Sequence, residues 1–71
     1  MKNYKDLTRE QKVIFNFIRY GSEGDFIQRG TKLVMRLSER GTSLPRCGIY
    51  ENEDTDGLNV NIFEAVEFLF N

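Results

Sequence analysis

The sequence contains no histidine and only one cysteine, Cys47, among its 71 residues. Histidine is the commonest metal ligand and general base in proteins, and a lone cysteine cannot form an internal disulfide. We therefore expect no zinc site and no cofactor, and we interpret Cys47 as a small buried hydrophobic residue. An unpaired cysteine also fits the reducing conditions of the cytoplasm.

Long apolar runs are missing as well. The first six residues are polar, and no stretch approaches the roughly 20 apolar residues that a membrane-spanning helix needs. We expect a cytoplasmic protein with no membrane partner. With 39% hydrophobic and 30% charged residues, the chain is predicted to form a single small domain, residues 1–71, around one modest core.

Basic residues are absent after Arg46. All ten Lys and Arg lie within residues 1–46 beside five acids, which gives this part a charge of +5. Residues 47–71 have a charge of −6, contributed by Glu51, Glu53, Asp54, Asp56, Glu64 and Glu67. Such sorting of charge is informative about partners rather than about the fold.

A first amphipathic helix is predicted from Arg9 to about Tyr20. Thr8 and Gln11 have the spacing of a capping box, and Gly21 is a typical residue at a helix end. The apolar face is predicted to comprise Val13, Ile14, Phe17 and Ile18. On the other side a polar stripe is formed by Lys5, Arg9, Lys12, Asn16 and Arg19.

A second amphipathic helix is predicted from about Glu23 or Asp25 to Arg40, with Gly41 as its stop signal. Its apolar face would comprise Phe26, Ile27, Gly30, Leu33, Val34 and Leu37. Gly30 in this face indicates a close backbone approach, or alternatively a break, with Thr31 capping a shorter helix. Its basic ridge would comprise Arg29, Lys32, Arg36 and Arg40.

The remaining residues suggest a change of structure. Residues 41–46 have the composition of a loop, and residues 47–50 and 58–60 are predicted to be short strands of a β-hairpin around an acidic turn. Asn61 and Glu64 mark the start of a C-terminal helix. The expected fold is therefore α+β and helix-dominated, with two amphipathic helices, a short β-hairpin and a C-terminal helix; the alternative is an all-α three-helix domain.

The acidic turn has the spacing of a metal site only in part. Residues 52–57 resemble the opening of an EF-hand calcium loop, but the position that requires a bidentate acid is Phe63. We therefore predict a solvated turn and no metal site. No glycine-rich phosphate loop or activated serine is recognisable, so we expect no catalytic residues and no enzymatic activity.

The opening segment, Leu7 to Gln11 with Phe15 and Ile18, resembles the first helix of some winged-helix repressors. This resemblance implies a small DNA-binding transcriptional regulator, and the basic ridge Arg29, Lys32, Arg36 and Arg40 would then be its nucleic-acid-binding surface. Against it, the pI is about 5.3, whereas nucleic-acid-binding domains commonly exceed about 9. The basic residues could instead line solvated helix faces and balance the acidic part.

The favoured hypothesis is a small protein-binding module that inhibits or modulates a larger partner. In size and composition the chain is similar to small inhibitors made by phages and mobile elements. A partner that normally receives nucleic acid would offer a basic groove to the acidic turn. Phe15, Tyr20 and Phe68 are predicted at or beyond the edges of the apolar faces, where aromatic residues can anchor contacts. The predicted partner-binding residues are Tyr50, Glu51, Glu53, Asp54, Asp56 and Phe68. The two oppositely charged parts are also compatible with a homo-oligomer.

Overall fold

Two α-helices and one four-stranded antiparallel sheet are present in the computed structural model, which describes residues 3–39, 44–51 and 57–71. The order along the chain is a short 3-10 helix η1 (Tyr4–Asp6), α1 (Arg9–Arg19), β1 (Phe26–Arg29), β2 (Lys32–Arg36), β3 (Arg46–Glu51), β4 (Leu58–Asn61) and α2 (Ile62–Phe70).

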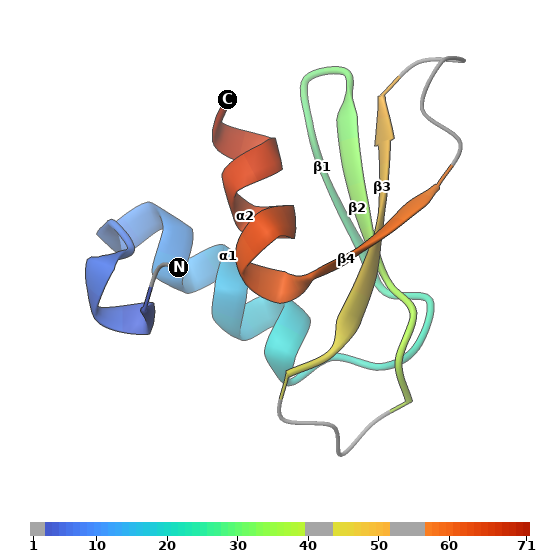
Figure 1. Cartoon of the computed structure of the whole chain (residues 1–71), viewed down its shortest axis with the longest axis horizontal. Helices are drawn as coiled ribbons and strands as arrows, with labels where there is room; N and C mark the ends of the chain where they lie inside the picture. Colours follow the sequence, from blue (N-terminus) through green and yellow to red (C-terminus); the bar gives the residue numbers. More distant parts are fainter. Residues whose placement is uncertain (1–2, 40–43, 52–56) are drawn as a thin grey trace.

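The strands lie in the order β1-β2-β3-β4, so each pairs with its neighbour in sequence. Both helices lie on the same side of this sheet (Figure 1). Helix α2 packs on β2, β3 and β4, while α1 packs mainly against α2. We call the helix-covered side of the sheet its inner face and the opposite side its outer face.

The starts of both helices are those predicted from the sequence. Thr8 and Gln11 form the expected capping box, with the Gln11 amide donating to Thr8 Oγ1 at 3.2 Å and the Thr8 amide donating to Gln11 Oε1 at 2.9 Å. At α2 the Glu64 amide donates to Asn61 Oδ1 at 2.9 Å. These side chains satisfy amides that have no partner within the helix.

The prediction of a second helix is wrong, because residues 26–36 form the β1–β2 hairpin. Arg29 pairs with Lys32 across a turn of only two residues, Gly30 and Thr31. Gly30 has φ = 65°, a left-handed value that glycine adopts without strain and that two-residue hairpin turns require. Gly30 therefore marks a chain reversal rather than a close helix contact.

The fold is consequently α+β, but it is neither helix-dominated nor an all-α three-helix domain. The predicted second hairpin is present, since β3 and β4 pair from Arg46 opposite Asn61 to Ile49 opposite Leu58. The β1–β2 and β3–β4 hairpins are joined by the β2–β3 pairing, which completes the four-stranded sheet.

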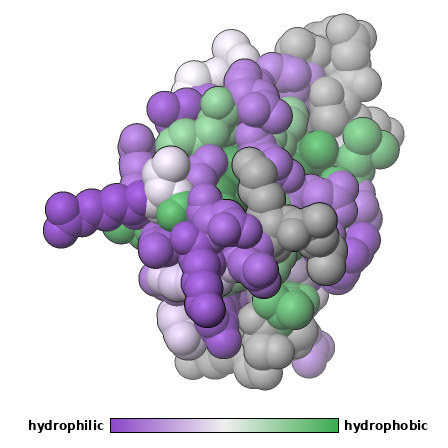
Figure 2. Space-filling view, turned by 60° about the vertical axis from the view of Figure 1, so that its left-hand side comes forward, coloured by the Kyte–Doolittle hydropathy of each residue, from purple (hydrophilic) through white to green (hydrophobic). Residues whose placement is uncertain are grey.

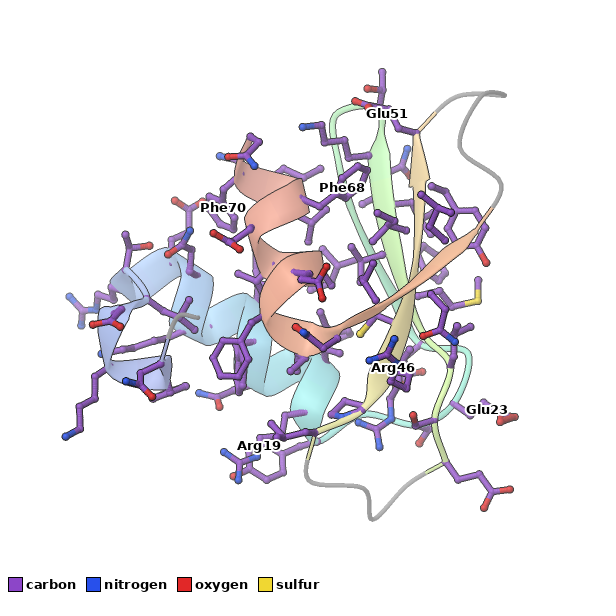
Figure 3. The ribbon with its side chains drawn as sticks, in the orientation of Figure 1. Arg19, Glu23, Arg46, Glu51, Phe68 and Phe70 are labelled. Atoms are coloured by element: carbon purple, nitrogen blue, oxygen red, sulfur yellow. The ribbon has the colours of Figure 1, made fainter. Side chains whose placement is uncertain are left out.

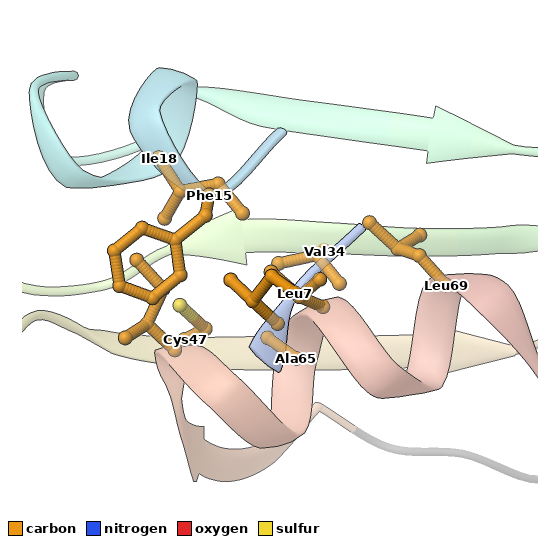
Figure 4. Close-up of a cluster of buried hydrophobic side chains, with 9 residues drawn as sticks. Leu7, Phe15, Ile18, Val34, Cys47, Ala65 and Leu69 are labelled. Atoms are coloured by element: carbon orange, nitrogen blue, oxygen red, sulfur yellow. The ribbon is translucent and has the colours of Figure 1, made fainter. Parts of the chain in front are cut away.

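The core lies between the inner face and the two helices (Figure 4). Cys47 is buried within it, as its interpretation as a small hydrophobic residue requires. The ring of Phe15 contacts those of Tyr4 and Phe63, with centroids 5.2 and 5.0 Å away. The buried cluster comprises Leu7, Phe15, Ile18, Val34, Cys47, Ile62, Ala65, Val66 and Leu69.

One cation is buried beside this core. Arg36 on β2 is only 1% exposed, and its guanidinium donates to four backbone carbonyls. Two of these end helix α1, those of Ile18 at 2.7 Å and Arg19 at 2.9 Å. The other two, of Ser38 and Glu39, follow β2. Arg36 therefore caps α1 and fixes the chain that leaves the sheet.

We predict that Arg36→Met lowers the free energy of unfolding by about 3–5 kcal/mol, since it leaves buried carbonyls without donors. This is a large part of the stability of so small a domain, so the variant should be partly unfolded at 37 °C. Arg36→Lys, which retains the charge but not the planar donor set, should cost about 1–3 kcal/mol.

Urea unfolding followed by circular dichroism provides the measurement, and Arg46→Lys is the matched control. Arg46 is exposed and bonds to Asn59, so its replacement should cost less than about 1 kcal/mol. Equal losses for the two lysine variants would contradict a special role for Arg36.

Candidate functional site

The predicted partner-binding residues Tyr50 and Phe68 lie on opposite faces of the sheet. Tyr50 is opposite Leu33, while the next pair, Glu51 and Lys32, has the other orientation because successive side chains of a strand alternate. Lys32 contacts Phe68 of α2, so that pair belongs to the inner face. Tyr50 therefore belongs to the outer face, and the two aromatic residues cannot form one contact site.

Phe68 is half-buried and packs against the core rather than projecting freely. It lies between α2 and the sheet, at the end where β3 finishes with Glu51 (Figure 3). The ammonium of Lys32 is 5.1 Å from the centroid of its ring and donates to the backbone oxygen of Asn71 at 2.8 Å. These contacts give Phe68 a role in packing.

The other predicted acidic contacts, Glu53, Asp54 and Asp56, lie outside the described residues, as does most of the segment that resembles a calcium loop. Within residues 3–39, 44–51 and 57–71, no group of three or more Cys, Asp or Glu side chains is arranged to hold a metal ion. None of the helices in this part of the chain is long and apolar enough to cross a membrane.

Three of the four residues of the predicted basic ridge hold the ends of helices. Arg36 caps α1, as described above. Arg29 donates to the carbonyl of Leu69 in α2 at 3.0 Å, with its guanidinium 4.4 Å from the centroid of the Phe70 ring. Lys32 bonds to the last residue, and Arg40 lies outside the described part. The predicted helix face does not form, because Arg29, Lys32 and Arg36 belong to strands β1 and β2.

The sequence also misassigned the apolar face of α1. Phe15, placed at its edge, is buried, whereas Val13 and Phe17, placed within it, are exposed. Val13 is 65%, Phe17 49% and Tyr20 73% exposed, and their spacing puts them on one line along the helix. We call these three residues the α1 ridge.

Basic residues accompany the α1 ridge. Arg9 precedes Val13 by one helical turn and is exposed, and Arg19 lies beside Tyr20 with its guanidinium 5.4 Å from the ring centroid. Arg19 projects from the C-terminal end of α1 (Figure 3). Figure 2 shows the side of the molecule near η1 and α1, where hydrophilic side chains predominate and hydrophobic ones form small separate areas.

The outer face of the sheet is a second apolar surface. Phe26 of β1 is 54% exposed and lies opposite Met35 of β2, which is half-buried together with Leu33 and Tyr50. None of these four residues packs against the buried core. Both described helices are on the inner face, so neither of them covers the outer one (Figure 1).

Two glycines allow Tyr50 to lie flat on this surface. A Cβ atom added at Gly57 would be 2.9 Å from the Tyr50 ring, and one added at Gly48 would be 3.0 Å from its hydroxyl oxygen. Side chains at these two positions would displace the ring. The glycines therefore leave room for the Tyr50 ring on the β3 side of the outer face.

Comparison with protein-family models, curated proteins and solved structures finds no match to this chain. The surfaces described above are therefore interpreted from their own chemistry.

Burial determines the chemistry of Cys47. Loss of solvation raises the pKa of its thiol from 9.0 to about 11, although the charges of Arg36 and Arg46 act in the opposite direction. Because the thiolate is the reactive form, the buried thiol is a poor nucleophile.

We predict that Cys47 contributes to the alkaline limit of stability. Above pH 9 the unfolded thiol ionises while the folded thiol stays protonated up to about pH 11, so stability falls between these values. In urea titrations the wild type should lose more stability than Cys47→Ala between pH 8 and 11. Parallel pH profiles would contradict this assignment.

Proposed function

We propose that this protein is a non-enzymatic protein-binding module that inhibits or modulates a larger partner through helix α1. The observation that carries this proposal is the α1 ridge: Val13, Phe17 and Tyr20 are all about half exposed or more, on the side of the helix away from the core. Single exposed hydrophobic residues are normal, but a line of three on one helix is typical of a contact surface.

The spacing of the ridge suits a partner with a hydrophobic groove. Helices that bind in grooves use anchors at positions i, i+4 and i+7, which is the spacing of these three residues. Helix α1 is already folded against α2 before any contact forms. Binding therefore requires little ordering of the chain, which favours affinity.

The charges beside the ridge indicate the chemistry of the groove. Arg9 and Arg19 lie at its two ends, with Lys12 on the same helix, against the single acidic residue Glu10. A partner groove with an acidic rim would complement this distribution and increase the rate of association. Aromatic residues and arginine are also the residue types most enriched at the energetic centres of interfaces.

The acidic residues Glu51, Glu53, Asp54 and Asp56 remain a candidate second contact, directed to a basic groove on the partner. A nucleic-acid-handling target made by the host of a phage or mobile element would supply such a groove. This part of the proposal depends on the charge pattern of the sequence.

The DNA-binding alternative loses the helix on which it depended. Backbone oxygens of this chain accept hydrogen bonds from Arg29, Lys32 and Arg36. Binding a phosphate backbone would require these cations to give up those bonds. We therefore do not propose DNA binding as the function.

We predict that Phe17→Ala weakens binding to the partner about 10- to 100-fold, which corresponds to about 1.4–2.7 kcal/mol. Phe17 is half exposed in the free protein, so the unfolding midpoint should hardly change. The partner is isolated by affinity capture from native host lysate, with nuclease-treated and untreated samples in parallel, and the affinity of each variant is measured by calorimetry.

Phe26→Ala is the matched control, because it removes an aromatic ring of similar exposure from the other side of the molecule. Reversal of Glu53, Asp54 and Asp56 to lysine tests the acidic contact. If that reversal abolished binding while Phe17→Ala and Tyr20→Ala had no effect, the ridge would not be the binding surface. Capture that disappears on nuclease treatment would argue against a protein partner altogether.

A further inference from the structure

The outer face of the sheet carries an apolar cluster that neither described helix covers. Antiparallel sheets with one free face normally place apolar residues inside and polar residues outside. Here the inner face carries the core residues Val34 and Cys47, as expected, but β1, β2 and β3 also place Phe26, Leu33, Met35 and Tyr50 on the outer face, beside the polar Gln28. These four outer residues do not pack against the core, so they are available for contact with another molecule.

We propose that the outer face is the interface between two copies of this chain, packed sheet against sheet. The central residues of this interface are Phe26, Leu33, Met35 and Tyr50. The proposal concerns the side of the molecule opposite the helices and is independent of the partner contact at α1.

Charge favours a second copy as the occupant. Along the four strands, the only charged side chain on the outer face is that of Arg46, which donates to Asn59 Oδ1 at 2.7 Å and to the Asn59 carbonyl at 3.3 Å. The apolar centre is neutral, so two identical faces meet without repulsion. By contrast, α1 carries several cations, and two copies of it would repel each other.

The arrangement of the apolar residues is compatible with the same occupant. The Tyr50 ring lies over Gly48 and Gly57 on the β3 side, while Phe26 lies opposite Met35 on β1 and β2. A twofold axis through the middle of the face would set Phe26 and Met35 of one copy against the Tyr50 side of the other. A self-complementary patch of this kind is what a closed dimer requires.

The area of the outer face indicates how strongly two copies would associate. Neighbouring strands are about 4.8 Å apart and each residue advances about 3.4 Å, so four strands of about five residues cover roughly 300 Å². Two such faces bury less than the roughly 1,200 Å² typical of stable complexes. We therefore expect a dimer in exchange with the monomer.

Sedimentation equilibrium of the full chain, from about 10 µM to about 1 mM, tests the proposal. The expected result is a mass that rises with concentration from 8.3 kDa toward twice that value. Because the interface is apolar and neutral, raising the salt from about 0.05 M to about 0.5 M should leave dimerisation unchanged or slightly stronger. A dimer held by the oppositely charged parts of the chain would instead dissociate with salt.

Phe26→Asp should weaken dimerisation at least tenfold, because each copy would bring an unpaired carboxylate into the interface. Tyr20→Asp, which places the same charge on the opposite side, is the matched control and should have no effect. Circular dichroism checks that both variants fold, and Phe26→Ser replaces Phe26→Asp if the latter does not.

Three results would overturn the proposal. They are a monomer at every concentration, a dimer that dissociates as salt rises, and a dimer that resists Phe26→Asp but not Tyr20→Asp. The first two results do not bear on partner binding by α1. The third would place the dimer contact on α1, and the capture experiment with Phe17→Ala then decides separately whether α1 also binds a partner. Failure of the dimer and failure of the proposed function are therefore distinguishable.

Discussion

Both helices of this protein end in carbonyls that are satisfied by the same β-hairpin. Arg36 donates to the last turn of α1, while Arg29 and Lys32 donate to the carbonyl of Leu69 and to Asn71 at the end of α2. Helix α2 has no basic residue in its own last turn, so the charge that complements its dipole comes from strands. The hairpin therefore does more than pair with β3. It holds the C-terminal ends of both helices at fixed positions over the sheet, and the packing of the core between them depends on that arrangement.

This use of cations determines what is left for the surface. Strand residues alternate between faces, so directing Arg29, Lys32 and Arg36 toward the helices necessarily directs Leu33, Met35 and Phe26 away from them. The inner face tolerates its cations because carbonyls and aromatic rings surround them, as the contacts of Arg29 with Phe70 and of Lys32 with Phe68 show. The positions of Leu33, Met35 and Phe26 on the outer face thus follow from capping the helices from a strand. Dimerisation at the outer face would therefore use residues whose positions the fold already determines.

The sequence revealed those parts of the fold that depend on local interactions. Thr8 with Gln11 and Asn61 with Glu64 identified the helix starts, because the capping hydrogen bonds join residues three apart. The β1–β2 hairpin was not recognised, because its inward row contains Arg29, Lys32 and Arg36 beside Val34, and this mixture conceals the alternation of a strand. Helical spacing then matched by coincidence. The Gly30-Thr31 pair was the signal that could have indicated a two-residue turn. Likewise, Val13 and Phe17 could not be assigned to solvent, since which side of α1 meets α2 is a tertiary property.

The sorting of charge along the chain changes its meaning in three dimensions. The basic part looked like a surface for phosphates, yet three of its cations hold backbone carbonyls, and those that remain beside apolar residues, such as Arg9 and Arg19, lie on α1. Cations that bond to carbonyls within the molecule contribute little counterion release when a nucleic acid binds. Arg9 and Arg19 are different, because they lie on the helix whose exposed residues include Val13, Phe17 and Tyr20. A charged and apolar surface selects a partner of complementary chemistry, while a neutral apolar sheet face accepts a copy of itself. Since the two surfaces lie on opposite sides of the molecule, a dimer formed through the sheet would leave both copies of α1 accessible, and its two ridges could bind a two-site partner more tightly than one ridge alone.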